Sequence, residues 1–171
     1  MIRKILTVAT IAASAFLLDQ ATKWLILNVI MMPPRVIEIT PFFNLRLGFN
    51  TGVSFGMFRD FFEEWPGILT IFKLVVSTGL IVWALRTSIN SERIGLSLMA
   101  GGALGNALDR YLEGAVTDFL DVHLLGWHWP TFNMADVAIV CGVGLLLLVA
   151  FQDTSKQLAS GMPQDGGGTG G

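Results

Sequence analysis

Seven polar or charged side chains lie at the ends of two apolar segments between residues 101 and 136. They are Asn106, Asp109, Arg110, Asp118, Asp121, Asn133 and Asp136. Two carboxyl groups held close together share one proton, because both cannot ionise cheaply. One then acts as a general base toward water and the other as a general acid, which is the chemistry of an aspartic protease. An ion or proton pathway through a membrane would use the same groups, so the residues alone leave both functions open.

Helical spacing arranges four of these side chains in pairs. Asn106 and Arg110 are four residues apart, and Asn133 and Asp136 are three apart, so each pair shares one helix face. Two helices can therefore present two amides, a guanidinium and a carboxylate to one cavity.

The second carboxylate of the pair has three candidates, which are Asp109, Asp118 and Asp121. If residues 116–123 are extended, Asp118 lies on one face of the strand and Asp121 on the other. The spacing does not choose among the three.

Other catalytic chemistries lack their residues. His123 and His128 stand in an aromatic loop, the sequence has no Gly-x-Ser-x-Gly motif, and we expect both rings at the membrane interface. A His-Glu-x-x-His motif is also missing, and the single cysteine, Cys141, is expected only to pack. We therefore expect no metal and no cofactor.

The composition indicates an integral membrane protein. Hydrophobic residues make up 53% of the 171 residues and charged residues 14%, and the mean hydropathy is +0.63. A soluble domain of this size could not enclose so much apolar surface. The net charge is −2, with no basic run, so no nucleic-acid partner is expected.

The fold class expected is a membrane all-α protein with four transmembrane helices. Apolar runs predict these spans at about residues 5–30, 67–85, 94–108 and 132–151. Together they form one membrane-embedded domain, residues 1–152, followed by a flexible glycine-rich tail, residues 153–171. The chain begins like a secretory signal peptide, but its apolar pattern resumes after Asp19, so we expect a retained helix.

The distribution of lysine and arginine predicts the orientation. On the side of the two termini, residues 1–4, 86–93 and 152–171 contain five lysines and arginines. On the other side, the longer segments 31–66 and 109–131 contain only four. Since positive charge stays on the cytoplasmic side, both termini are expected in the cytoplasm. The polar cluster then faces outward.

The segment of about residues 35–60 predicts a small β region on the membrane surface. It is rich in β-branched and aromatic residues and is interrupted by Gly48, Gly52 and Gly56. Locally, Asn50 is typical of a turn that uses Gly52. From residue 109 to residue 131 we expect a loop of mixed composition.

Two lysines inside the apolar helices need an explanation. Lys23 follows Asp19 by four residues, which favours a structural ion pair on one helix face. Lys73 is the only charge within its span, and we expect its side chain to extend to the interface.

Gly101 and Gly105 form a small-xxx-small pair suited to close helix packing.

Five separated motifs resemble the lipoprotein signal peptidases, also called signal peptidase II. In order, they are Asp19-Gln20-x-Thr22-Lys23, Asn50-Thr51-Gly52-x-Ser54-Phe55-Gly56, Gly101-Gly102-Ala103-Leu104-Gly105-Asn106-x-x-Asp109-Arg110, Val116-x-Asp118-Phe119 and Phe132-Asn133-x-Ala135-Asp136. Each motif is weak alone, but five in this order are highly specific. Ser54 departs from the small residue, such as alanine, that the family often has.

The resemblance implies an intramembrane aspartyl endopeptidase of the bacterial inner membrane, active toward the periplasm. It implies removal of the signal peptide from diacylglyceryl-modified prolipoproteins, just before the lipidated cysteine. By motif, the catalytic pair is Asp118 and Asp136, and the substrate-binding residues are Asn50, Asn106, Arg110 and Asn133. Structural support is assigned to Asp19, Lys23 and Asp109. The β region becomes a periplasmic platform, the expected partners are the lipid-modified prolipoprotein and membrane lipids, and a monomer is expected.

Overall fold

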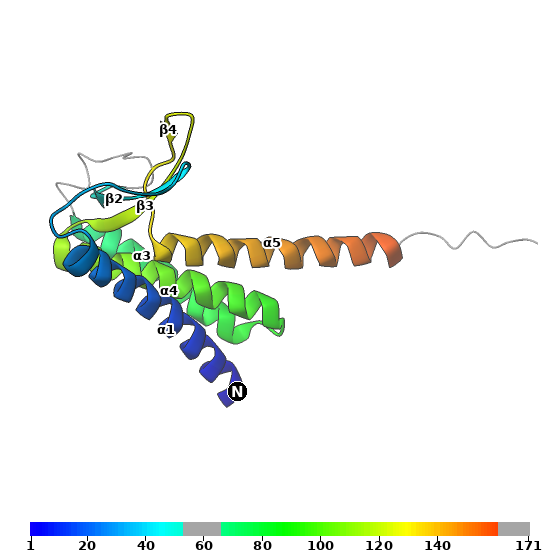
Figure 1. Cartoon of the computed structure of the whole chain (residues 1–171). Helices are drawn as coiled ribbons and strands as arrows, with labels where there is room; N and C mark the ends of the chain where they lie inside the picture. Colours follow the sequence, from blue (N-terminus) through cyan, green and yellow to red (C-terminus); the bar gives the residue numbers. More distant parts are fainter. Residues whose placement is uncertain (53–65, 161–171) are drawn as a thin grey trace, which may run out of the picture.

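The computed structural model describes residues 1–52 and 66–160. Its helices are α1 (Ile2–Leu25), continued by a π-helical turn (Ile26–Ile30), then α3 (Pro66–Arg86), α4 (Asn90–Glu113) and α5 (Met134–Ser160). Its strands are β1 (Ile37–Thr40), β2 (Phe43–Asn50), β3 (Val116–Leu124) and β4 (Trp127–His128). The helices lie side by side beneath the sheet, and α1 and α5 spread apart away from it (Figure 1).

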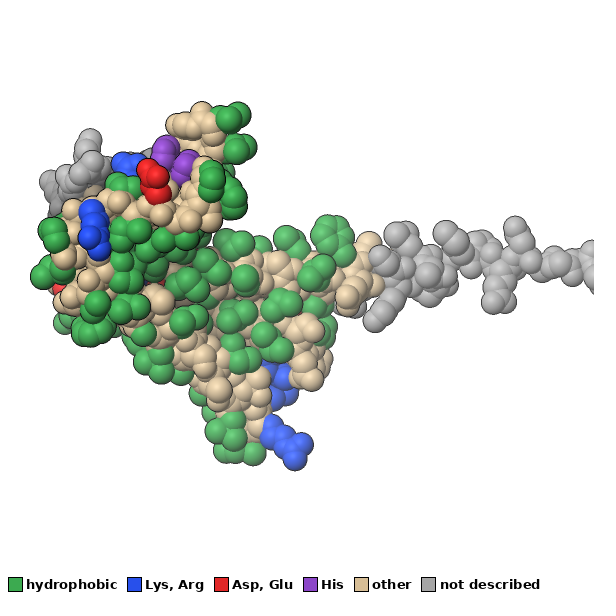
Figure 2. All heavy atoms as spheres, viewed as in Figure 1, with side chains coloured by type: hydrophobic (Ala, Val, Ile, Leu, Met, Phe, Trp, Pro, Cys, Tyr) green, Lys and Arg blue, Asp and Glu red, His purple; other side chains and the backbone are tan. Residues whose placement is uncertain are grey.

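Three of the helical segments are long and apolar enough to cross a membrane. Within the described residues these are Ile2–Ile30, Gly67–Arg86 and Met134–Gln152. Apolar side chains cover the visible face of the helical body, while charged side chains gather toward the sheet and toward the opposite end (Figure 2). The structure is thus mostly helical, with a small antiparallel sheet at one end.

Helix α4 is less apolar because the other three helices pack around it. Its glycines permit this close approach: a side chain at Gly101 would overlap the backbone of Ala12 in α1, and one at Gly102 would overlap Ala135 in α5. A helix enclosed in this way needs little lipid-facing apolar surface.

Replacing Gly102 by alanine is expected to lower stability by about 1–3 kcal/mol, the usual cost of overpacking. The added methyl group would occupy the space of the Ala135 carbonyl oxygen, so the start of α5 must move. The unfolding temperature in detergent measures the effect. Gly144→Ala is the matched control, because nothing lies within 4 Å of the position that its Cβ would take; equal losses in both variants would contradict the packing argument.

The sheet joins segments that are distant in the sequence. Its order is β1-β2-β3-β4, all antiparallel, and β2 pairs with β3 so that Gly48 lies opposite Asp118 and Asn50 opposite Val116. The loop expected over residues 109–131 is therefore wrong for most of its length. Helix α4 runs on to Glu113, Gly114 ends it with a φ of 73°, and β3 and the short β4 follow. Glycine adopts this left-handed conformation without steric cost, which explains the abrupt end.

Two further boundaries differ from those expected. Helix α4 begins at Asn90 instead of 94, and α5 continues to Ser160 instead of ending at 151. The residues after 151 include helix formers such as Gln152, Lys156 and Leu158, so the helix continues past its apolar part. Residues 53–60 of the expected β region and residues 161–171 of the expected tail lie outside the described residues.

Candidate active site

Asp136 is held by the first turn of α5. Asn133 stands just before the helix, and its Oδ1 accepts a hydrogen bond from the Asp136 backbone N–H at 3.1 Å. In return, the Asn133 backbone N–H donates to Asp136 Oδ2 at 3.2 Å. This reciprocal arrangement is a capping box, which satisfies two amides and fixes the carboxylate at the helix N-terminus.

Asn133 also connects Asp136 to Asp118. Its Nδ2 donates to Asp118 Oδ1 at 2.6 Å and to Asn106 Oδ1 at 3.1 Å. Asn106 Nδ2 in turn donates to Asp136 Oδ1 at 3.0 Å. Asp118, Asn106 and Asn133 are buried and Asp136 is half-buried, so two carboxyl groups and two amides form one connected and largely buried group.

Burial raises the pKa of Asp118 to about 7, and repulsion from Asp136 adds to the effect. Hydrogen bonds from Asn133 and Asn50 and the charge of Lys23 oppose it but do not cancel it. Near neutral pH the Asp118 carboxyl group therefore exchanges its proton readily. This is the property of a group that shares a proton with a neighbouring carboxylate.

Lys23 connects two further carboxylates beneath this group. Its Nζ lies 2.8 Å from Asp19 Oδ2, 2.7 Å from Asp109 Oδ2 and 3.1 Å from Asn106 Oδ1. All of these side chains are buried. The expected ion pair between Asp19 and Lys23 is present, and Asp109 belongs to the same cluster of charges.

Each of these carboxylates fixes a residue next to a member of the aspartate pair. Asp19 Oδ1 accepts the Ala135 backbone N–H at 2.9 Å, and Asp109 Oδ2 accepts the Thr117 backbone N–H at 3.2 Å. Ala135 precedes Asp136 and Thr117 precedes Asp118. The Lys23 cluster thus anchors both aspartates through their neighbours.

Gln20 is a site residue that the motif contained but to which we assigned no role. Its Nε2 donates to Asp109 Oδ1 at 2.9 Å and, at 3.2 Å, to Asp19 Oδ2. It therefore supports the same cluster from α1. Its position directly after Asp19 is the feature of the sequence that points to such a role. The hydrogen bond to Asp109 spans 89 residues, however, and no local spacing predicts it.

Arg110 and Asn50 border the group on the side of the sheet. Arg110 Nη2 donates to the Gly52 carbonyl oxygen at 2.6 Å. Its Nε and Nη1 are buried and find no partner within residues 1–52 and 66–160. Asn50 Oδ1 accepts the Gly52 N–H at 3.1 Å, as a turn requires, and its side chain also hydrogen-bonds to Asp118.

Asp121 lies away from the pair, on the opposite face of β3. It is fully buried, with His128 Nδ1 at 2.8 Å from its Oδ1 and Asn44 Nδ2 at 3.3 Å from its Oδ2. Burial opposes its ionisation, but these hydrogen bonds and the nearby positive charges outweigh that cost, so the pKa of Asp121 is lowered. His128 stacks on His123 at 4.8 Å between ring centroids. The alternation along the strand thus separates Asp118 from Asp121.

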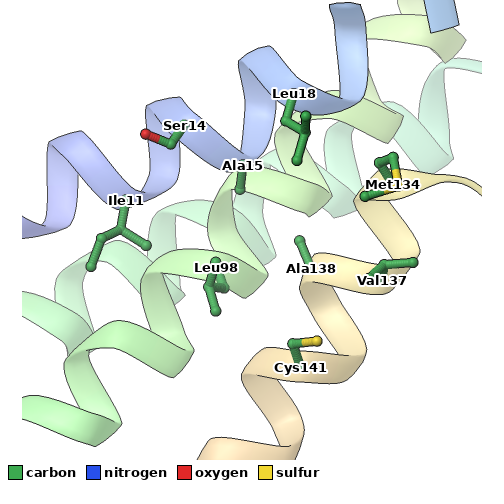
Figure 3. Close-up of a pocket in the computed structure, with 9 residues that line it drawn as sticks. All are labelled: Ile11, Ser14, Ala15, Leu18, Leu98, Met134, Val137, Ala138 and Cys141. Carbon is green, nitrogen blue, oxygen red and sulfur yellow. The ribbon is translucent and has the colours of Figure 1, made fainter. Parts of the chain in front are cut away.

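An apolar groove of about 390 Å³ opens between α1 and α5. Leu18 and Met134 line it at the end near the site, and Leu98 of α4 contributes to its wall (Figure 3). Cys141 also lines the groove and is exposed, so it is a surface residue rather than the packing residue we expected. Within the described residues, no group of three His, Cys, Asp or Glu side chains is arranged to hold a metal ion.

Comparisons with known proteins agree on one family. A family model described as signal peptidase (SPase) II matches residues 11–152. A lipoprotein signal peptidase of Rhodopseudomonas palustris is 42% identical over 138 residues, covering 78% of this chain and 84% of the relative. Another, of Nitrobacter hamburgensis, is 42% identical over 148 residues, covering 84% and 90%.

A solved structure described as a bacterial membrane enzyme has a TM-score of 0.76 and 29% identity, covering 88% of this chain and 90% of that one. A second structure with the same description has a TM-score of 0.73. The motifs, the fold and the relatives thus agree, and the chain belongs to the signal peptidase II family, the peptidases of lipoprotein processing.

Proposed function

We propose that the protein is an aspartyl endopeptidase that removes the signal peptide from diacylglyceryl-modified prolipoproteins, cutting before the lipidated cysteine. The observation that carries this proposal is the connection between Asp118 and Asp136. Asn133 donates hydrogen bonds to both carboxyl groups at the start of a membrane helix. The family membership supports the choice of substrate.

In the proposed reaction the pair carries one proton. Asp118, with its raised pKa, holds that proton, and Asp136, which accepts hydrogen bonds from Asn106 and Asn133, is the base. Asp136 takes a proton from water as the water oxygen bonds to the scissile carbonyl carbon, and Asp118 protonates the carbonyl oxygen. The carbon–nitrogen bond then breaks as the nitrogen receives a proton from the acid form of Asp136. Asp118 takes back a proton from a hydroxyl group of the tetrahedral intermediate, so the products are an amine and a carboxylic acid and the pair again carries one proton.

Four residues around the pair are proposed to bind the substrate backbone and to hold the aspartates. Asn106 and Asn133 hold the carboxyl groups, while Asn50 and Arg110 face the peptide backbone. The Nε and Nη1 donors of Arg110, which have no partner among the described residues, suit peptide carbonyl oxygens. Asp19, Lys23 and Asp109 support the group from below and do not contact substrate.

We place the chain in the bacterial inner membrane as four spans, with α4 as the span enclosed by the others. The whole group of residues 1–152 acts as one domain, and a single chain supplies every proposed site residue, so a monomer suffices. The start of α1 and the end of α5 lie away from the sheet (Figure 1), as expected if both termini are cytoplasmic and the pair faces the periplasm. The substrate then enters from the bilayer, keeping its acyl chains in lipid.

The proposal is tested with purified protein and a diacylglyceryl-modified prolipoprotein. We expect one cut, before the lipidated cysteine, identified by mass spectrometry of both products. The same precursor without the lipid is the control and should be cleaved far more slowly. Absence of cleavage by folded protein would refute the proposed activity.

The rate is expected to fall as pH rises above about 7. Asp118 must be protonated to act as the acid, and its pKa of about 7 means that the proton is lost in this range. Measuring kcat/KM from pH 5 to 9 in one detergent checks the prediction. A rate that keeps increasing to pH 9 would contradict the assignment of Asp118 as the acid.

Chelators are expected to leave the rate unchanged, because the carboxyl pair supplies both proton transfers. Dialysis against EDTA, followed by the cleavage assay, measures this. Loss of activity that returns on adding one divalent metal would contradict the mechanism.

A further inference from the structure

Lys73 lies on the inward face of α3. Buried residues recur along this helix at Leu69, Thr70, Ser77 and Ala84, which is the spacing of one helix face, and the half-buried Lys73 falls within the same stripe. Most of the residues between them are exposed, while the half-buried Leu80 and Ile81 pack in the same cluster as Ala84. Lys73 therefore lies on the face of α3 that is directed toward the other helices.

The contact of Ser77 shows where this stripe is directed. Ser77 Oγ donates to the Ala100 carbonyl oxygen of α4 at 2.9 Å. Lys73 lies one turn nearer the start of α3, and the short link between α3 and α4 makes these helices antiparallel. Its side chain therefore lies on the part of α4 that leads to Asn106 and Arg110.

The charges that act on Lys73 agree with this position. Asp136 and Asp118 attract its ammonium group, while Arg110 and Lys23 repel it. No described residue forms an ion pair with Lys73. A charge that has no ion-pair partner among the described residues is costly within a membrane helix, so its retention calls for a function.

The charge balance of the site identifies that function. Below the aspartate pair, Asp19 and Asp109 exceed Lys23 by one negative charge, and a pair that shares one proton adds another. Among the described residues that face the pair, Arg110 and Lys73 supply the two balancing positive charges. With Lys73 the group is neutral, and without it this largely buried group carries one net negative charge.

We propose that Lys73 is a positioning residue for the reaction, whose ammonium group stabilises the single negative charge of the Asp118–Asp136 pair. This inference rests on the proposed aspartyl mechanism. A nearby cation favours ionisation of a carboxyl group. Lys73 therefore lowers the pH at which the pair takes up a second proton. Once that proton is bound, Asp136 no longer acts as a base.

The test compares pH profiles of kcat and kcat/KM for Lys73→Met and Lys73→Arg with that of wild type. Met keeps the length of the side chain and removes the charge, so the midpoint of the acidic limb should rise by about one pH unit, with KM little changed. Arg keeps the charge and should restore the midpoint. Val75→Met, on the exposed face of α3, is the matched control and should follow wild type.

Two results would overturn the inference while the proposed function stands. One is a Lys73→Met profile that overlays wild type, and the other is an equal loss of kcat in the Met and Arg variants with no change of midpoint. Unfolding temperatures verify folding, and Lys73→Gln replaces the Met variant if that protein is poorly folded. Absence of cleavage by wild type would instead refute the proposed function and this inference with it.

Discussion

Replacing either Asp118 or Asp136 by asparagine is expected to abolish cleavage of the lipid-modified prolipoprotein, while each variant should still insert and fold. Asparagine matches aspartate in shape but neither accepts a proton from water nor donates one as an acid. Since general acid–base catalysis contributes about 10²–10⁴-fold, we expect at least a loss of that size in kcat. Single-turnover cleavage by purified variants measures it.

The same substitution at Asp118 is expected to stabilise the protein at neutral and alkaline pH. The pKa of Asp118 is raised from 3.8 to about 7, so between these values the folded chain holds a proton that the unfolded chain has lost. The stability of wild type therefore falls as pH rises through this range, and Asp118→Asn removes this contribution. Unfolding temperatures in detergent at pH 5 and pH 8 should differ less for the variant.

Asp121→Asn is the matched control on the same strand. Asp121 is also buried, but it binds His128 and Asn44 on the other face of β3. Its pKa is lowered, so its negative charge stabilises the fold at pH values above those at which a carboxyl group ordinarily titrates. The Asp121→Asn variant should therefore lose stability while it retains cleavage. Full activity in purified Asp118→Asn, or complete loss in a folded Asp121→Asn, would contradict the assignment of the pair.

The sequence indicates the helices and much of the site because both are local patterns. Apolar runs reveal α1, α3 and α5, and the three-residue interval from Asn133 to Asp136 places both residues on one face. That interval, just before an apolar run, also resembles the signature of a capping box, with aspartate in place of the usual Glu or Gln. The hydrogen bonds of that box could therefore have been predicted.

The remaining features depend on contacts that no local pattern contains. The pairing of β2 with β3 crosses both α3 and α4, so the second half of the sheet was expected as loop. The bond from Ala135 to Asp19 spans 116 residues. The packing of α3 on α4 decides that Lys73 lies on the inward face of α3. The motif resemblance implies a structural role for Asp19, but only the geometry shows that Asp19 holds the backbone next to Asp136.

Lys23→Met is expected to be the most damaging substitution for stability, with a loss of about 3–5 kcal/mol, because removing one partner leaves buried charge uncompensated. Asp19 and Asp109 would both lose their cation. Unfolding temperature in detergent, measured beside the exposed control Arg3→Gln, reports the loss. Stability equal to wild type would show that the buried carboxylates need no cation.

The loss should extend to catalysis, because Lys23 connects the supports of both aspartates. Asp19 fixes the amide before Asp136, and Asp109 fixes the amide before Asp118. If the cation is what matters, adding Asp19→Asn to Lys23→Met should restore part of the stability by removing one unpaired charge. Cleavage should recover less than stability, since an asparagine at position 19 accepts the Ala135 N–H more weakly than a carboxylate does. Recovery of both to the same extent would mean that Lys23 stabilises the fold without positioning the pair.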